Sequence, residues 1–319
     1  MCDDGSGHGR RSPGYRGAAE PRDQPAADPG SGALDVSNQA TAAAPTFGQR
    51  FLERAERFGP LCVGMDPHAG ILEQWSLPNT VEGLRAFSEI CVEAFSDRAC
   101  VVKPQVAFYE AFGSAGFAVL EESIRALREA GVLVIADAKR GDIGTTMAGY
   151  AAAWLRPGSP LEVDAVTVSP YLGFDSLHPV FELAEEHGKG AIVLAATSNP
   201  EAPSLQAGVV EGIRGERVSV AQDIVDRASD INRHHERAGN IGVVIGATLT
   251  EAPDLSQVNG MILMPGVGAQ GGTVQDVKRL TGTSYPLVSP NVSRSVLRTG
   301  PDIADLRVAI DTQSAELLK

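Results

Sequence analysis

The stretch Val132–Ile143 (VLVIADAKRGDI) shows the pattern that decides the fold, because a short apolar run passes directly into a cluster of charges. Side chains alternate across a β-strand, so Leu133, Ile135, Asp137 and Lys139 share one face. If the two aliphatic residues point into a closed sheet, the two charged residues point inward at its end. A plain structural ion pair is the alternative interpretation of the two charges.

Seven further apolar runs of similar length occur along the chain, and amphipathic segments lie between most of them. Short aliphatic and β-branched runs are typical of parallel strands that are buried on both faces. Eight alternations of strand and helix predict a (β/α)8 TIM barrel, with a doubly wound open sheet as the alternative. The eight runs are Leu61–Gly64, Cys100–Val102, Val132–Ala136, Ala165–Val168, Ala191–Ala195, Gly242–Ile245, Met261–Met264 and Leu287–Val288.

Three of the amphipathic segments give clear helix predictions. They are Thr80–Asp97, Phe117–Ala130 and Val218–Arg237. Their apolar residues recur at helical spacing. Asn79 and Glu82 are placed to cap the start of the first.

The first 45 residues have a different composition from the rest of the 319-residue chain. They are rich in Gly, Ala, Pro, Ser and charged residues and contain almost no large apolar side chains, so they cannot offset the entropy of ordering. We therefore expect residues 1–45 to be a disordered tail and residues 46–319 to be a single barrel domain. The alternative is that the natural chain begins near Thr46.

The charge balance and the cysteines exclude several classes of protein. The net charge is -13, which argues against nucleic acid or an anionic membrane as a general partner. No apolar run approaches the length of a membrane span, and the N-terminus lacks the apolar region of a secretory signal. The four cysteines, Cys2, Cys62, Cys91 and Cys100, form no CxxC pair, which favours reduced thiols in a cytoplasmic protein.

Polar residues follow most of the predicted strands, at the end of a parallel barrel where active sites are found. Lys103, Asp137, Lys139 and Asp142 are four ionisable groups that would converge there, which is more than a core needs. The other polar residues that follow strands are Asp66, Thr197, Ser198, Asn199, Asn291 and Arg294.

The glycine-rich stretch Gly266–Gly272 follows the seventh predicted strand. Glycines let backbone N–H groups approach a phosphate, and barrel phosphate sites often lie in the loops after strands seven and eight. Gln270 and Arg294 could add donors to the same group. An ordinary tight loop and a surface arginine are the alternatives.

The six histidines show no metal-ligand spacing. His234 and His235 fall in a predicted polar helix, where we expect a solvated face. The sequence therefore predicts no metal site.

Two motifs together are specific enough to identify a family. Asp137-x-Lys139-x-x-Asp142-Ile143-x-x-Thr146 resembles the signature of orotidine 5′-phosphate decarboxylases, and residues 265–272 (PGVGAQGG) resemble the phosphate loop of that family. Asp66, Lys103 and Ser198 also fall where the family has active-site groups. The resemblance begins near Phe47 and is closest to the longer bacterial branch of the family.

The resemblance implies a reaction without cofactor or metal, in which orotidine 5′-monophosphate is the substrate and uridine 5′-monophosphate the product. It also implies a homodimer with shared active sites. By this resemblance, Lys139 would donate the proton to C6, Asp137 would lie beside the substrate carboxylate, and Lys103 would bridge Asp137 and the ribose. Asp142 and Thr146 would reach across the dimer into the partner's site. Asp66 would bind a ribose hydroxyl and Ser198 the pyrimidine amide, and the phosphate would be held by Gly268, Gln270 and Arg294.

Two features depart from the family pattern. The segment from Ser198 to Arg217 is long, so a lid cannot be mapped on it, and the approach to Arg294 is more drawn out than in the family.

Metal-dependent sugar-phosphate enzymes of the same superfamily share the Asp-x-Lys-x-x-Asp strand but carry an acidic residue where Lys103 stands. A non-catalytic phosphate-binding barrel would need no Lys139. Lys103 therefore favours the nucleotide decarboxylase over the metal-dependent enzymes, and Lys139→Ala should leave the function of a non-catalytic barrel intact.

Overall fold

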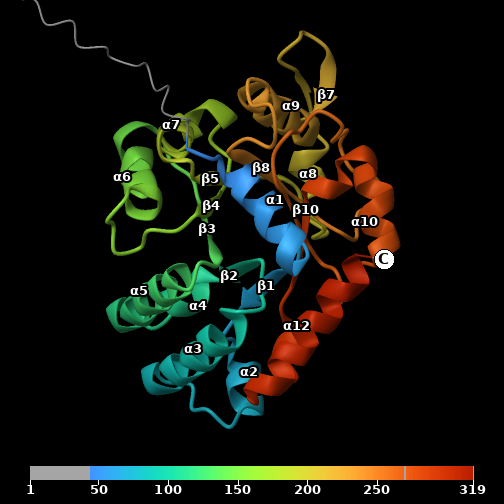
Figure 1. Ribbon diagram of the computed structural model, residues 1–319. Coiled ribbons are helices and arrows are strands. Elements are labelled where there is room, and N and C mark those ends of the chain that lie inside the picture. Colours follow the sequence, from blue (N-terminus) through green and yellow to red (C-terminus); the bar gives the residue numbers. More distant parts are fainter. Residues whose placement is uncertain (1–43, 269–270, 319) are drawn as a thin grey trace, which may run out of the picture. The chain divides into compact units, whose positions relative to one another are not determined.

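The computed structural model describes residues 44–268 and 271–318, which belong to one compact unit (Figure 1). Apart from Ala44 and Pro45, the predicted tail lies outside the described residues. Gln270 also lies outside them.

Eight parallel strands close into a barrel, so the predicted (β/α)8 fold is confirmed and the open-sheet alternative is wrong. Each predicted run overlaps one strand, with ends that differ by a few residues. The strands adjoin in the order β1-β10-β9-β8-β5-β4-β3-β2, and β2 closes the ring against β1. They are β1 (Cys62–Met65), β2 (Val101–Pro104), β3 (Leu133–Arg140), β4 (Ala165–Val168), β5 (Gly190–Ala196), β8 (Ile241–Ile245), β9 (Ile262–Pro265) and β10 (Val288–Val292).

Helices surround the barrel and lie between successive strands (Figure 1). The longer ones are α1 (Phe47–Phe58), α3 (Val81–Phe95), α5 (Gly113–Glu129), α6 (Gly144–Leu155), α7 (His178–His187), α9 (Val220–Asn232), α10 (Val274–Thr281) and α12 (Ile303–Leu317). The short ones are α2 (Ala69–Gln74), α4 (Val106–Glu110), α8 (Pro203–Gln206), α11 (Arg294–Leu297) and the 3-10 turns η1 (Phe174–Leu177) and η2 (Gly282–Leu287).

Helix α1 covers the end of the barrel at which the strands begin. A capping box formed by Thr46 and Gln49 starts the helix. Arg54 then donates to the carbonyls of Ala99 and Cys100, which come just before β2. Because α1 occupies this end, the opposite end, where the strands finish, is left for a site.

The barrel interior is apolar at the end covered by α1. Leu133 and Ile135 pack there with Phe47, Phe51 and residues of other strands, and Phe47 and Phe51 have no solvent exposure. The predicted alternation along β3 is therefore confirmed for its apolar half. Side chains on the outer face of the strands form a second apolar layer beneath the helices.

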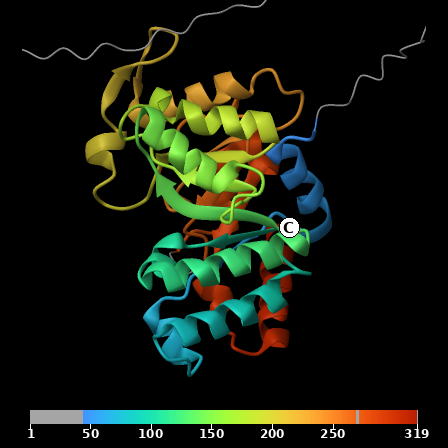
Figure 2. The same ribbon diagram turned by 90° about the vertical axis from the view of Figure 1, so that its left-hand side faces the viewer.

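Three details differ from the sequence-based expectation. Thr80, rather than Asn79, is the N-cap of α3, and its side chain accepts from the backbone of Gly83. Helix α9 ends at Asn232, five residues before the predicted end. The segment after Ser198 contains α8 and an antiparallel hairpin of β6 (Val209–Glu211) and β7 (Arg217–Ser219), and Figure 2 shows this hairpin on the opposite side of the barrel from α1.

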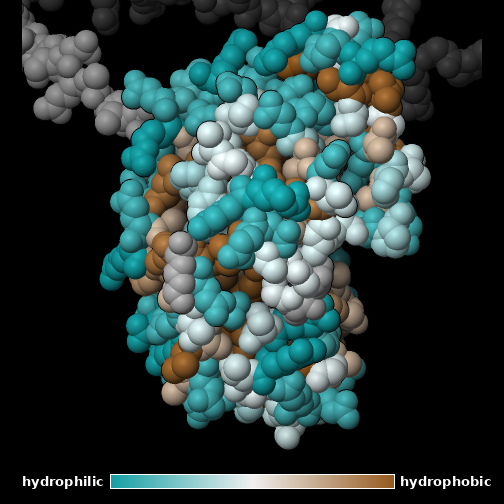
Figure 3. Space-filling view, turned by 90° about the vertical axis from the view of Figure 1, so that its right-hand side faces the viewer, coloured by the Kyte–Doolittle hydropathy of each residue, from teal (hydrophilic) through white to brown (hydrophobic). Residues whose placement is uncertain are grey.

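The face on the right-hand side of Figure 1 is mostly hydrophilic, with small apolar areas scattered over it (Figure 3). Within the described ranges, no helix is both long enough and apolar enough to cross a membrane.

Candidate active site

The carboxylate of Asp137 is the centre of a polar cluster at the end of the barrel opposite α1. Lys103 Nζ lies 2.8 Å from Asp137 Oδ2 and Lys139 Nζ lies 2.5 Å from Asp137 Oδ1. Gln105 donates to Oδ2 over 2.9 Å and Thr167 donates to Oδ1 over 3.0 Å. Both oxygens of this buried carboxylate are thus held by two donors each, which fixes its plane.

Three neighbouring strands bring these groups together. Lys103 lies on β2, Asp137 and Lys139 on β3, and Thr167 on β4, and the β2-β3 and β3-β4 pairs are parallel. The carboxyl ends of parallel strands meet at one edge, so side chains distant in sequence converge there.

The backbone of β3 is distorted at Lys139. The register with β4 shifts between Ala136 and Arg140, and Lys139 has a φ of 47°, in the left-handed region. Such a conformation costs a non-glycine residue on the order of 1 kcal/mol or more and is concentrated at functional sites. The N–H of Lys139 donates to Thr167 Oγ1 over 2.9 Å, so Thr167 supports both the distorted backbone and Asp137.

Burial and charge act in opposite directions on this cluster. Burial opposes ionisation of Asp137, but the ammonium groups of Lys103 and Lys139 outweigh it and hold the pKa of this carboxyl well below its ordinary value. Burial likewise disfavours the charged form of Lys103, and the charges of Asp137 and Asp66 outweigh it and raise the pKa of this lysine. Lys103 and Asp137 are therefore a buried ion pair at neutral pH.

The two lysines differ in access to solvent. The side chain of Lys103 is 5% exposed, whereas that of Lys139 is 47% exposed. Lys139 can therefore meet a ligand in the barrel opening, while Lys103 is positioned to hold Asp137.

Asp66, which follows β1, has a carboxylate oxygen that is available for a ligand. Its Oδ1 is buried and makes no hydrogen bond with any of the described residues. Buried polar atoms normally have partners, so an unpaired oxygen at a barrel opening is consistent with a binding role. Gly64 lies beside it, and a β-carbon at Gly64 would stand 3.3 Å from Asp66 Oδ2 and 2.7 Å from Ser293 Cβ.

The glycine-rich loop after β9 folds back on itself. Gly268 N–H donates to Gly272 O over 2.9 Å, Gly272 N–H donates to Gly266 O over 3.1 Å, and Gly266 and Gly268 both have positive φ. A β-carbon on Gly268 would lie 3.9 Å from Ser295 Oγ, so the loop adjoins the start of α11. Arg294, the first residue of α11, is half-buried beside it.

The remaining predicted site residues lie around this cluster without bonding to it. Ser198 is exposed after β5 and faces Gly246, which follows β8. Asp142 accepts from the N–H of Ile143, and Thr146 is exposed in the first turn of α6. Among the described residues, neither Asp142 nor Thr146 makes a hydrogen bond to Asp137, Lys103 or Lys139.

A family model matches residues 59–308, and its description is orotidine 5′-phosphate decarboxylase / HUMPS family. The chain belongs to this family. The match includes all eight strands of the barrel and every site residue named above.

Individual members of the orotidine 5′-phosphate decarboxylase / HUMPS family are also similar. An orotidine 5′-phosphate decarboxylase of Corynebacterium efficiens is 62% identical over 274 residues, which cover 85% of this chain and 96% of that protein. A protein of Streptomyces avermitilis, described as a candidate orotidine 5′-phosphate decarboxylase, has a crystal structure that matches with a TM-score of 0.81. Its sequence is 48% identical, and the match covers 86% of this chain and 95% of that chain. The OMP decarboxylase of Leishmania donovani is 31% identical with a TM-score of 0.66 over 86% of this chain and 98% of its own.

Sequence reasoning missed Gln105 and Thr167. Gln105 follows Lys103-Pro104 directly, and Thr167 is the polar residue within the apolar run Ala165–Val168. A hydroxyl inside a buried strand needs a partner, and that signal could have indicated Thr167.

Proposed function

We propose that the chain decarboxylates orotidine 5′-monophosphate to uridine 5′-monophosphate in pyrimidine biosynthesis, and that Lys139 donates the proton to C6. The observation that carries the proposal is the Lys103–Asp137–Lys139 array, in which one buried carboxylate is held between two ammonium groups. The 62% identity to a named orotidine 5′-phosphate decarboxylase supports the substrate. Lys103 also stands where the metal-dependent sugar-phosphate relatives carry an acid.

The reaction breaks the bond between C6 and the carboxylate carbon, and its electron pair stays on C6. The carbanion has little resonance relief, so the site must stabilise it electrostatically. The ammonium of Lys139 supplies a positive charge and then a proton to C6, which leaves a neutral amine. At about 4 Å and an effective dielectric of about 20, one such charge pair contributes about 4 kcal/mol.

That contribution is small beside the barrier reductions of about 8–23 kcal/mol that enzymes achieve. We assign a further part to binding of the remote phosphate, which orients the reacting ring. In this proposal the phosphate is held by Gly268, Gln270 and Arg294. Asp66 binds a ribose hydroxyl, and Ser198 binds the pyrimidine amide. The Gly268 loop adjoins Ser295 in α11, the helix that begins at Arg294, and this supports a joint phosphate site.

Asp137 and Lys103 set the electrostatic environment around the reacting end of the substrate. Asp137 holds the Lys139 ammonium and, beside the substrate carboxylate, adds repulsion that disappears as CO2 leaves. Lys103 keeps Asp137 ionised and extends from it toward the ribose. Ground-state repulsion is a secondary contribution in this account, after the electrostatic stabilisation of the carbanion.

We also propose a homodimer in which Asp142 and Thr146 serve the partner's site. Ile143, Tyr171 and Leu172 are large apolar residues that are 60%, 74% and 54% exposed. They follow β3 and β4 beside Asp142, and the two loops adjoin because a β-carbon on Gly141 would stand 2.5 Å from Ser169 O. Exposed apolar residues gathered in one place are typical of a protein interface.

The catalytic domain in this proposal is residues 46–319, and its location is the cytoplasm. The three described cysteines, Cys62, Cys91 and Cys100, are buried free thiols, in keeping with a reducing compartment.

The test is conversion of orotidine 5′-monophosphate by the purified chain in the presence of EDTA, followed by ultraviolet absorbance. We expect full turnover with the chelator present. No turnover by a chain with a cooperative unfolding transition would reject the substrate. Turnover that stops when EDTA is added would reject the reaction without a metal.

A further inference from the structure

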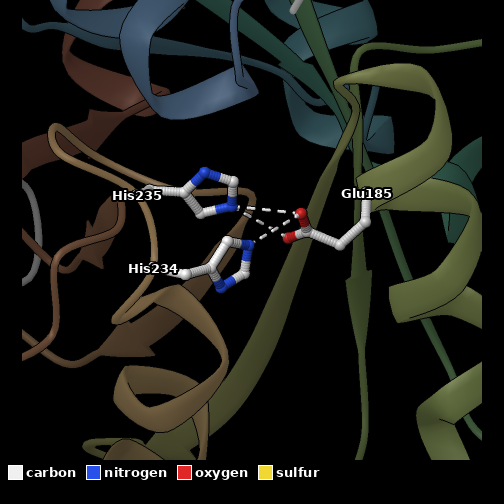
Figure 4. A group of neighbouring side chains, drawn as sticks. All are labelled: Glu185, His234 and His235. Atoms are coloured by element: carbon white, nitrogen blue, oxygen red, sulfur yellow. Dashed lines mark hydrogen bonds and ion pairs between the residues drawn. The ribbon is translucent and has the colours of Figure 1, made fainter.

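Glu185, His234 and His235 form a cluster of ligand-type side chains away from the candidate active site. Their nearest carboxylate and imidazole atoms all lie within 4.8 Å of one another. His235 Nε2 is 3.0 Å and 3.3 Å from the two oxygens of Glu185, and His234 Nε2 is 3.7 Å from Oε2. Figure 4 shows the two rings side by side, each with a nitrogen directed at the Glu185 carboxylate.

The cluster joins two connections that lead into adjacent strands. Glu185 is in the last turn of α7, which precedes β5, and the histidines are in the turn between α9 and β8. Strands β5 and β8 pair in parallel, and both begin at the end of the barrel covered by α1. The expectation of a helix position for the two histidines is therefore wrong, because both lie beyond α9. The expected solvation holds for His234, which is 60% exposed, but not for His235, which is only 16% exposed.

The turn that carries His235 is held rigidly. The N–H of His235 donates to Asn232 O over 3.0 Å, and its carbonyl accepts from Asn259 Nδ2 over 2.9 Å. Asn232 is fully buried and donates to the carbonyls of Ile241 and Val258. Gly239 leaves room for the imidazole, because a β-carbon there would stand 2.7 Å from His235 Cδ2. The imidazole of His235 is thus placed before any ion binds.

We propose that Glu185, His234 and His235 bind a divalent transition-metal ion of the zinc class. Zinc binds histidine nitrogen at about 2.0–2.1 Å and carboxylate oxygen at about 2.0–2.2 Å with tetrahedral geometry, so its neighbouring ligand atoms stand about 3.4 Å apart. Glu185 Oε2 lies 3.0 Å from His235 Nε2 and 3.7 Å from His234 Nε2, and these two separations bracket this spacing. His234 is 60% exposed, so water completes the coordination from the solvent side.

The site stabilises the fold and takes no part in decarboxylation. It lies at the end of the barrel where residues serve stability rather than catalysis. An ion bound there joins the α7–β5 and α9–β8 connections and stabilises the folded chain by RT ln(1 + c/Kd), where c is the concentration of the free ion. Imidazole ligands select zinc over Mg²⁺, which prefers oxygen ligands.

The test is calorimetric titration of ZnCl2 into the full-length chain, without a polyhistidine tag and freed of metal by chelation. We expect one equivalent to bind, and Mg²⁺ not to compete. Glu185→Gln, His234→Ala and His235→Ala should each weaken zinc binding at least tenfold. His178→Ala is the matched control, because His178 pairs with Glu182 on α7 over 3.4 Å outside the cluster, and it should bind zinc as the unaltered chain does.

A second readout separates binding from folding. Zinc at about tenfold over its dissociation constant should raise the Tm of the unaltered chain by about 3 to 5 °C and leave Glu185→Gln and His234→Ala unchanged. These two side chains are the more exposed of the three, so both variants should fold in EDTA with the Tm of the unaltered chain. Zinc affinity that survives in both variants, or that falls equally in His178→Ala, would overturn the proposal.

Discussion

The ammonium of Lys103 lies 2.8 Å from Asp137 Oδ2, and both side chains are less than 10% exposed. A buried charge is tolerated only with its partner, so neither residue can be removed alone without cost. Lys139 bonds the other oxygen of the same carboxylate but extends toward solvent. The buried Lys103–Asp137 pair is thus a rigid support that positions the more accessible Lys139.

We predict that Asp137→Asn lowers the free energy of unfolding by about 3–5 kcal/mol, because the charge of Lys103 is left buried without a counterion. Adding Lys103→Met should recover part of the loss, since it removes the stranded charge. Urea unfolding of the two single variants and the double variant measures the coupling. Additive losses would show that the two residues do not stabilise each other.

Arg294→Ala should raise KM for the nucleotide about 10- to 100-fold, because a charge-assisted hydrogen bond to phosphate contributes about 1.5–3 kcal/mol. Arg298→Ala is the control, since Arg298 is exposed one turn later on the same short segment. Steady-state kinetics of both variants measure the change in KM. An equal effect of the two substitutions would remove Arg294 from the phosphate site.

Mixing Lys139→Ala and Asp142→Ala chains should restore activity if Asp142 serves the neighbouring site. Half of the dimers in an equal mixture are hybrids, and each hybrid has one intact site of two, so recovery should approach about one quarter of the unaltered activity. Subunit exchange is checked by mass spectrometry of the intact dimer. Exchanged dimers without activity would place Asp142 in its own chain's site.

Glu162 should make stability depend on pH in acid. Burial opposes its ionisation, but hydrogen bonds from Lys189, the Gly158 backbone and Arg128 outweigh it and lower its pKa to about 2. A carboxyl with a lowered folded pKa contributes its full stability above the ordinary pKa and loses it as pH falls through the folded value.

Glu162→Gln should therefore destabilise the chain by about 2 kcal/mol at pH 7, and the difference should shrink between about pH 5 and pH 2. Glu129→Gln, at an exposed position on α5, is the control and should be neutral. Urea unfolding at several pH values measures both. A constant difference across this range would contradict the role of Glu162.

Much of the candidate site follows from local sequence rules. Alternation along β3 placed Asp137 and Lys139 on one face, and the rule for strand ends added Lys103 and Asp66. The left-handed backbone of Lys139 could not be predicted, because it arises from the register shift between β3 and β4. Thr167 was missed because its hydroxyl is within an apolar run.

Sequence patterns could not predict the contacts between turns that are distant in the chain. Glu185 is 49 residues before His234, and the two meet only because β5 and β8 are neighbours in the barrel. The hairpin of β6 and β7 was also not predicted, since its strands have three residues each and little apolar alternation.

The central claim is that Lys139 carries out the chemistry on a bound nucleotide. The measurement that tests it most directly is turnover of orotidine 5′-monophosphate by Lys139→Ala, beside calorimetric binding of uridine 5′-monophosphate to the same variant. We predict that turnover falls by about 10²- to 10⁴-fold or more, while product affinity stays within about tenfold, because the phosphate and ribose contacts remain. Turnover within tenfold of the unaltered chain, with product binding intact, would contradict the account.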